Sequence, residues 1–215
     1  GDGYYDQNVM LLDALGGSVH VEAGTVSFGA LPVVDTHMLG GMAMANTPHH
    51  LQALSSDLHV FFGCNWAANK AGNHTWYMQQ CRERGAKVII IDPWLNQTAQ
   101  VIADEWVPIK PGCDIALLLG ICNVLVSEDL YDHEFVEKWC YGFDALREEM
   151  KDKTPEWAAA IAQVDADDIR GAARLYASGK PSAFHWGLST DMTPNGVGQA
   201  HAFMVLEGIT GNVDV

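Results

Sequence analysis

The chain has 215 residues, of which 48% are hydrophobic, so it can bury a sizeable core as one large α/β domain or two closely packed lobes. Its 27 acidic against 12 basic residues give a formal net charge of −15, which repels phosphate backbones and argues against nucleic-acid binding. The 5 cysteines form no Cys-x-x-Cys pair, which argues against a zinc or iron–sulfur site made by this chain alone. No apolar run approaches the roughly 20 residues that a membrane span needs, which argues against direct membrane insertion.

Both ends predict an internal piece of a longer protein. The chain opens on Gly1-Asp2-Gly3 without an initiator Met, and it closes shortly after an apolar helical pattern, where a continuing chain would turn.

The first clear pattern is a β-loop-α-β unit. The apolar run 58–63 predicts a buried parallel strand that opens into a polar loop over 64–73. A helix is expected over 74–84, closed by Gly85 in the position that favours a left-handed cap. The β-branched run 87–91 predicts a second strand, and this order is typical of a right-handed parallel crossover.

A third strand is expected over 105–109, followed by a turn at Pro111-Gly112. Asp114 is placed to cap an apolar helix over 115–126, and a further strand is predicted over 180–186. Helix caps at Thr154 and Asp165 and a closing helix over 199–209 complete the pattern.

Alternating strands and helices predict an α/β fold with a doubly wound, mostly parallel sheet and flanking helices, whose ligands bind outside the carboxyl ends of the strands. Residues 1–57 are rich in Gly, His and Met and are expected to form a first lobe or covering segment. Residues 58–180 are expected to form a dinucleotide-binding domain, and 181–215 a strand and helix that return to the first lobe.

Three turns follow predicted strands and are expected to converge on one crevice. A glycine there lets backbone amides approach a phosphate, Asn65 offers a donor and an acceptor, and Asp92 can accept hydrogen bonds from ribose hydroxyls. Asp114 can accept the paired N–H donors of a guanine edge. Asp92 is otherwise an ordinary turn residue and Asp114 an ordinary cap, but their joint placement favours a nucleotide site. The turns are Gly63-Cys64-Asn65-Trp66, Asp92-Pro93 and Pro111-Gly112-Cys113-Asp114.

An ordered series of short motifs resembles the molybdopterin-dependent oxidoreductases of the dimethyl sulfoxide reductase family. The series begins with Gly63-Cys64-Asn65 and continues with 85–93, which ends in Ile-Asp-Pro, and with 104–114, which ends in Pro-Gly-Cys-Asp. It goes on through 154–158 to 206–212. The chain lacks both a Gly-x-Gly-x-x-Gly after the first strand and a Walker motif, which disfavours a plain nicotinamide site or an ATPase.

The resemblance implies a bis-molybdopterin guanine dinucleotide cofactor carrying molybdenum or tungsten. It implies that the loop of Asn65, together with Asp92 and Asp114, contacts one nucleotide, and that Gly187 lies near a pterin. It further implies a 4Fe-4S cluster region upstream and a β-barrel domain downstream. A small-molecule substrate, electron-transfer iron–sulfur and membrane-anchor subunits, and a periplasmic or membrane-associated exported complex are also expected from the family.

Ser27 is the candidate metal ligand and catalytic residue. The stretch 24–30 is similar to the one where dimethyl sulfoxide and trimethylamine N-oxide reductases place a metal-binding serine, and a serine alkoxide is a hard donor suited to a high-valent metal. Serine favours S-oxide or N-oxide reduction, whereas cysteine or selenocysteine favours nitrate or formate chemistry. The alternative is that Ser27 simply occupies a turn between Gly24 and Gly29.

Several positions depart from the family pattern. Trp66 stands where the family often has proline, Trp94 where arginine follows Asp-Pro, and no Gln-Arg pair follows Gly187. The chain is therefore expected to be part of an S-oxide or N-oxide reductase, with two alternatives. One is a cofactor-free structural or subunit-docking relative, and the other is an ordinary nucleotide-dependent dehydrogenase.

Overall fold

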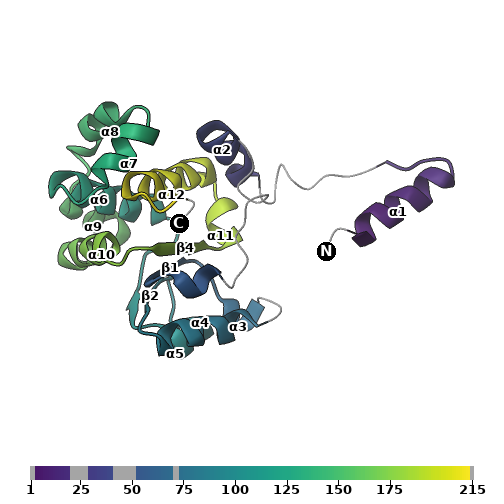
Figure 1. Cartoon of the computed structure of the whole chain (residues 1–215), viewed down its shortest axis with the longest axis horizontal. Coiled ribbons are helices and arrows are strands. Elements are labelled where there is room, and N and C mark those ends of the chain that lie inside the picture. Colours follow the sequence, from purple (N-terminus) through teal and green to yellow (C-terminus); the bar gives the residue numbers. More distant parts are fainter. Residues whose placement is uncertain (1–2, 20–28, 41–51, 70–72, 214–215) are drawn as a thin grey trace.

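A four-stranded parallel sheet lies at the centre of the protein (Figure 1). The computed structural model describes residues 3–19, 29–40, 52–69, 73–213. The strands are β1 (Leu58–Phe62), β2 (Lys87–Ile91), β3 (Glu105–Val107) and β4 (Ser182–Trp186), in the spatial order β3-β2-β1-β4. The chain therefore adds strands on one side of β1 and then crosses to the other side for β4. This doubly wound parallel arrangement confirms the predicted fold class.

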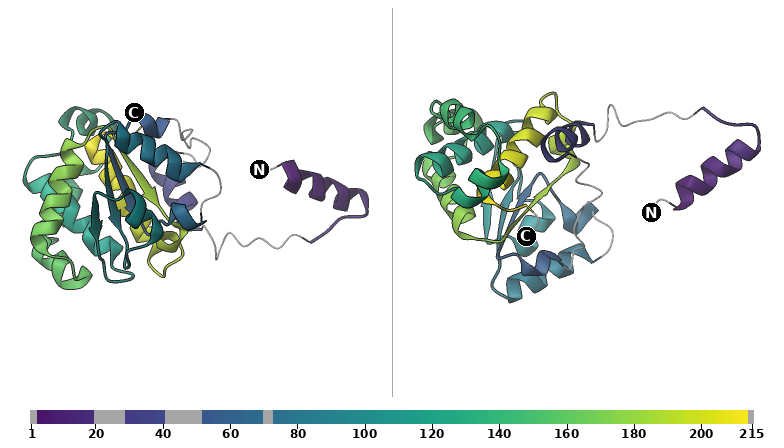
Figure 2. Two further views of the ribbon diagram at one scale, coloured as in Figure 1. Left: turned by 90° about the horizontal axis from the view of Figure 1, so that it is seen from below. Right: turned by 45° about the horizontal axis from the view of Figure 1, so that its top comes forward.

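Helices cover both faces of the sheet (Figure 2). Leu58, Val60 and Phe62 of β1 point into the larger core, which α6, α9, α10 and α12 complete, whereas Phe61 points into a smaller core formed with α4 and α5. The period of two along β1 thus feeds two apolar layers, as expected for a strand buried on both faces. The helices are α1 (Gly3–Ala14), α2 (Ala30–Leu39), α3 (Trp66–Asn69), α4 (His74–Glu83), α5 (Gln97–Ile102), α6 (Asp114–Ser127), α7 (His133–Trp139), α8 (Phe143–Met150), α9 (Pro155–Ala162), α10 (Ala166–Ser178), α11 (Leu188–Asp191) and α12 (Gly196–Thr210), with a 3₁₀ turn η2 (Gln52–Ser55).

Local capping follows the sequence at two helices and departs from it at a third. The Thr154 and Asp165 side chains accept hydrogen bonds from the backbone N–H groups of Trp157 and Asp167, as expected of N-caps. The cap predicted at Asp114 is wrong by one position, because Cys113 is the N-cap and Asp114 is the first helical residue. The Asp114 carboxylate is thereby left for other contacts.

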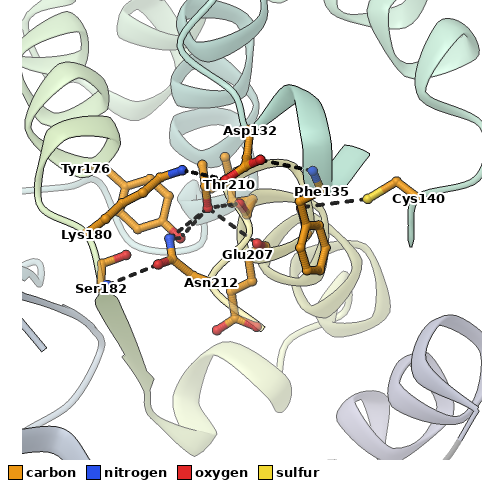
Figure 3. A network of polar contacts seen from close by, with 11 residues as sticks. Asp132, Phe135, Cys140, Tyr176, Lys180, Ser182, Glu207, Thr210 and Asn212 are labelled. Atoms are coloured by element: carbon orange, nitrogen blue, oxygen red, sulfur yellow. Dashed lines mark hydrogen bonds and ion pairs between the residues drawn. The ribbon is translucent and has the colours of Figure 1, made fainter. Parts of the chain in front are cut away.

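A buried polar network fastens the end of α12 to the start of β4 (Figure 3). The Tyr176 hydroxyl accepts hydrogen bonds from Thr210 Oγ1 at 3.2 Å and Asn212 Nδ2 at 3.3 Å, and Asn212 Oδ1 accepts one from the Ser182 backbone N–H at 3.0 Å. Burial raises the pKa of Tyr176, so its hydroxyl stays protonated. This network lies at the amino end of β4, opposite the edge where ligands of such sheets bind.

Glu207 on α12 is half-buried, and the pKa of its carboxyl group is raised to about 8 by burial first and by the Asp35 carboxylate of α2 second. This folded-state pKa lies above the ordinary 4.5, so the neutral carboxyl group is favoured by folding. Its contribution to the free energy of unfolding is fully present below pH 4.5 and is lost as the pH rises through about 8.

We expect Glu207→Gln to melt at the same temperature as the wild type at acidic pH and at a higher temperature than the wild type at alkaline pH. Thermal unfolding of the full-length protein at both pH values tests this, with the exposed Glu149→Gln as control; parallel pH profiles for Glu207→Gln and wild type would contradict it.

Candidate nucleotide site at the carboxyl edge of the sheet

The carboxyl ends of the strands are held side by side by backbone hydrogen bonds that continue one residue beyond each strand. The N–H of Gly187 donates to Phe62 O at 2.8 Å, that of Gly63 to Ile91 O at 3.0 Å, and that of Asp92 to Val107 O at 3.2 Å. The loops predicted to form the crevice therefore start next to one another. They lie at the edge where doubly wound sheets bind ligands.

Gly63 and Gly187 meet at the switch point, where the chain order reverses between β1 and β4. A Cβ on Gly187 would lie 2.1 Å from the Gly63 carbonyl oxygen, and Gly63 itself has a φ of 55°. The Ser189 hydroxyl donates a hydrogen bond to the same carbonyl at 3.1 Å. The backbones can approach this closely only because both residues are glycine. Backbone atoms of Gly63 and Gly187 therefore form this part of the carboxyl edge of the sheet.

Asp92 organises the second loop. Its carboxylate accepts hydrogen bonds from Trp94 N–H at 3.1 Å and from Asn96 Nδ2 at 2.9 Å, and its carbonyl accepts one from Trp106 Nε1 at 3.0 Å. Asn96 Nδ2 also donates to the Cys64 carbonyl at 3.2 Å, so one buried amide joins the first loop to the second. Sequence reasoning missed Asn96, whose only signal was its position four residues after Asp92 as a candidate helix cap.

Asn65 braces the first loop against α5. Its Nδ2 donates to Gln97 Oε1 at 2.6 Å, and its Oδ1 accepts hydrogen bonds from the Thr98 hydroxyl at 3.0 Å and backbone N–H at 3.3 Å. Thr98 Oγ1 in turn accepts the Ala67 N–H at 2.9 Å. The Asn65 amide therefore holds the loop in shape, and its side chain is half-buried.

Two other predicted residues of the first loop contribute mainly to the interior. The Cys64 side chain is buried in the smaller core, and its thiol donates to the His185 carbonyl at 3.3 Å. The Trp66 ring packs edge-on against Phe61 and His185, with ring centroids 4.9 and 4.6 Å apart. Neither side chain is therefore free to reach a ligand without giving up these interior contacts.

Asp114 begins α6 and is 9% exposed. Burial raises the pKa of its carboxyl group, its own backbone N–H lowers it, and the neighbouring Asp92 carboxylate raises it again. Within the part of the chain that the structure describes, no side chain donates a hydrogen bond to this carboxylate. The Asp92 and Asp114 carboxylates thus lie close together, and a ligand with N–H donors would suit this arrangement.

The remaining predicted residues are distributed as follows. Pro93, Pro111 and Gly112 are exposed on the loops at this edge, and Gly112 has a φ of 76° that suits the turn. Ser27 lies outside the described residues. The structure thus brings together Gly63, Asn65, Asp92, Asp114 and Gly187 at one edge.

The residues fit a guanine nucleotide in their chemistry. A buried carboxylate that accepts no hydrogen bond from a side chain of the described residues matches the adjacent N–H groups of guanine. Residues 10–215 match the family model described as "Molybdopterin oxidoreductase". The chain belongs to the molybdopterin oxidoreductase family.

Individual relatives agree with membership of the molybdopterin oxidoreductase family. Acetylene hydratase of Syntrophotalea acetylenica is 39% identical over 73% of this chain and 21% of its own length. The probable dimethyl sulfoxide reductase chain YnfF of Escherichia coli (strain K12) is 34% identical over 95% of this chain and 28% of its own length. The solved structure of acetylene hydratase from Pelobacter acetylenicus superposes with a TM-score of 0.68 at 36% identity, covering 75% of this chain and 22% of that one.

The chain spans between a fifth and a third of the length of these molybdopterin oxidoreductases. Among the described residues, no group of three or more His, Cys, Asp or Glu side chains is arranged to hold a metal ion. None of the helices in the described ranges is long and apolar enough to cross a membrane.

Proposed function

We propose that this chain forms part of the binding site for a bis-molybdopterin guanine dinucleotide in an S-oxide or N-oxide reductase of its family. The convergence of Asp92 and Asp114 at the carboxyl edge of the sheet carries the proposal. When bound, the molybdenum or tungsten centre supplies oxygen-atom transfer chemistry, while the residues of this chain bind and orient the cofactor.

Each part of the edge has a distinct task in this proposal. The Asp114 carboxylate accepts the N–H donors of guanine, and Asp92, held by Asn96, orients the second loop and faces the ribose. We assign phosphate or pterin to the backbone around Gly63 and Gly187, which approach each other too closely for a side chain on Gly187. Ser27 provides the oxygen ligand of the metal.

The wider setting of the enzyme follows from the same proposal. A 4Fe-4S region and a downstream barrel complete the catalytic subunit, and electrons arrive through partner subunits. The name of YnfF, a reductase chain, supports this assembly. Export to the periplasm or its membrane is tested by reading the flanking gene for a cysteine cluster and a twin-arginine leader.

Cofactor analysis of the purified full-length protein tests the proposal directly. We expect molybdenum or tungsten together with guanine nucleotide released on acid hydrolysis, and turnover with dimethyl sulfoxide or trimethylamine N-oxide. Acetylene, formate and thiosulfate are the comparison substrates, because relatives carry those names. The missing Gln-Arg pair after Gly187 favours a cofactor-free docking relative as the second candidate, and protein without metal and without nucleotide would replace the proposal by that candidate.

Substitutions at the two carboxylates separate binding from stability. We expect Asp114→Asn to reduce the guanine nucleotide retained by roughly tenfold or more, since a hydrogen bond to a charged group contributes about 1.5–3 kcal/mol. The pKa of Asp114 is raised in the folded protein, so its ionised carboxylate opposes folding. Without cofactor, the Asp114→Asn variant should therefore have a melting temperature at pH 7 no lower than that of the wild type.

Asp92→Asn serves as the contrasting variant. Both oxygens of Asp92 accept hydrogen bonds inside the protein, so this change should lower the melting temperature as well as the nucleotide content. If Asp114→Asn retains full nucleotide, Asp114 has no part in guanine binding.

A further inference from the structure

Three consecutive apolar residues are exposed directly after Asp92, in the loop that follows β2. They are Pro93, Trp94, which is 58% exposed, and Leu95, which is 44% exposed. Among the described residues, no other ring and no cationic side chain stacks on the Trp94 indole. Single exposed apolar residues are ordinary, but a contiguous group beside buried polar residues is typical of a ligand-binding surface.

The backbone of Trp94 is held on both sides. Its N–H donates to Asp92 Oδ1 at 3.1 Å, and its carbonyl accepts a hydrogen bond from the Asn96 N–H at 2.8 Å. Asn96 is itself buried and donates from Nδ2 to Asp92 Oδ2 at 2.9 Å. The exposed indole therefore stands on an ordered backbone, so a ligand that binds it loses little affinity to ordering the loop.

A second indole adjoins Asp92 from β3. Trp106 is 37% exposed, and its Nε1 donates to the Asp92 carbonyl at 3.0 Å. This bond uses the only polar group of that side chain, so Trp106 otherwise offers an apolar ring. Pro93, Trp94, Leu95 and Trp106 together form an apolar patch around Asp92.

Asp114 adds a second carboxylate to this region. Burial raises the pKa of its carboxyl group, and the charge of the nearby Asp92 carboxylate raises it further. Asp92 and Asp114 are 5% and 9% exposed, so neither charge is well solvated. A ligand that suits both the carboxylates and the apolar patch needs N–H donors on its edge and a flat apolar face. Guanine has both.

We propose that the Trp94 indole stacks on the face of the guanine base whose edge Asp114 binds. This inference rests on the proposed function and adds a second contact surface for the base. Stacking accepts any base, because every base has a π-face, whereas a carboxylate selects the N–H donors of guanine. Trp94 is a position at which this chain departs from the family pattern, so the stacking contact is a property of this chain and not of the family match.

Three variants of the full-length protein test the inference, Trp94→Ala, Trp94→Phe and Asp114→Asn, with Trp139→Ala as matched control. Trp139 is 68% exposed and precedes Cys140, whose thiol donates to the Gly208 carbonyl of α12 at 3.7 Å. This contact lies beside the network at the amino end of β4 (Figure 3). The control therefore removes an equally exposed indole near the opposite edge of the sheet.

Two measurements are made on each protein. The first is the guanine nucleotide retained by protein purified with its cofactor. The second is equilibrium binding of guanosine monophosphate, adenosine monophosphate and ribose 5-phosphate to full-length protein prepared without cofactor. Ribose 5-phosphate has no base, so it reports on the loop and its carboxylate without stacking.

We expect Trp94→Ala to bind both nucleotides roughly tenfold or more weakly, the size of one lost base–aromatic stack, and to bind ribose 5-phosphate like the wild type. It should also retain less guanine nucleotide. Trp94→Phe keeps a ring and should recover most of the affinity. Asp114→Asn should weaken guanosine monophosphate more than adenosine monophosphate. Trp139→Ala should match the wild type throughout.

Wild-type affinity of Trp94→Ala for both nucleotides, or wild-type retention of guanine nucleotide, overturns the inference, because the indole is then covered by something other than the base. An equal loss of ribose 5-phosphate binding in Trp94→Ala also overturns it, because the loop and not a stack has then been lost. Failure of the proposed function gives a different pattern, in which wild-type protein holds no guanine nucleotide and Asp114→Asn changes nothing. Loss of guanine nucleotide in Asp114→Asn beside an unaffected Trp94→Ala rejects stacking alone.

Discussion

Gly187→Ala is expected to open the carboxyl edge of the sheet and to deplete the protein of nucleotide. The added Cβ would lie 2.1 Å from a backbone oxygen of Gly63, which cannot move as a flexible side chain can. The backbone of Gly187, at φ −85° and ψ 157°, is allowed for alanine, so the effect is steric and not conformational. Forced overpacking of this kind costs about 1–3 kcal/mol or more. The melting temperature and the guanine nucleotide content of the full-length protein should both fall.

Gly171→Ala is the matched control for this substitution. Gly171 lies inside α10, and a Cβ there would meet nothing within 4 Å. Replacing glycine by alanine in a helix interior is expected to stabilise by about 0.5–1 kcal/mol. If Gly187→Ala melts like Gly171→Ala and keeps its nucleotide, the close approach of β1 and β4 is not what builds the site.

Ser27→Ala in the full-length enzyme is expected to abolish most S-oxide reduction while metal and guanine nucleotide are retained. In the proposed function the variant lacks the hard oxygen donor, whereas the residues assigned to nucleotide binding, Asp92 and Asp114, are unchanged. Mass spectrometry of the metal, nucleotide analysis and turnover of dimethyl sulfoxide are the measurements. Ser27→Cys, which provides a softer ligand, should retain metal and change the substrate preference.

Ser178→Ala is the control for Ser27→Ala, because Ser178 is exposed on α10 and its hydroxyl donates only to the Leu175 carbonyl. It should match the wild type in all three measurements. Wild-type turnover of Ser27→Ala would remove this serine from the mechanism and leave the nucleotide site unaffected.

The strands were predictable because their signals are local. The β-branched run 87–91 coincides with β2, and the apolar run 58–63 contains β1. Their boundaries need no tertiary information, because each run ends at a turn residue. The spatial order β3-β2-β1-β4 could not be predicted in the same way, because nothing within the sequence of β4 indicates which strand it pairs with.

The parts of the site that the sequence did not reveal depend on contacts between distant residues. Asn96 resembles an ordinary helix cap until the Cys64 carbonyl is found within its reach. The Asp191 carboxylate accepts a hydrogen bond from the Leu31 backbone N–H at the start of α2, 160 positions upstream, so no local pattern marks this contact. The family resemblance singled out Asp92 and Asp114, and the structure places both near the carboxyl edge of the sheet, with Asp114 as the first helical residue and not the cap.

The meeting of Gly63 and Gly187 bears on how such a protein can diverge. Where two peptide backbones approach this closely, the shape of that edge of the sheet depends on the absence of two side chains and not on the identity of many. Relatives named for acetylene and for dimethyl sulfoxide are 39% and 34% identical to this chain over 73% and 95% of its length, so proteins named for different substrates resemble the same stretch of chain.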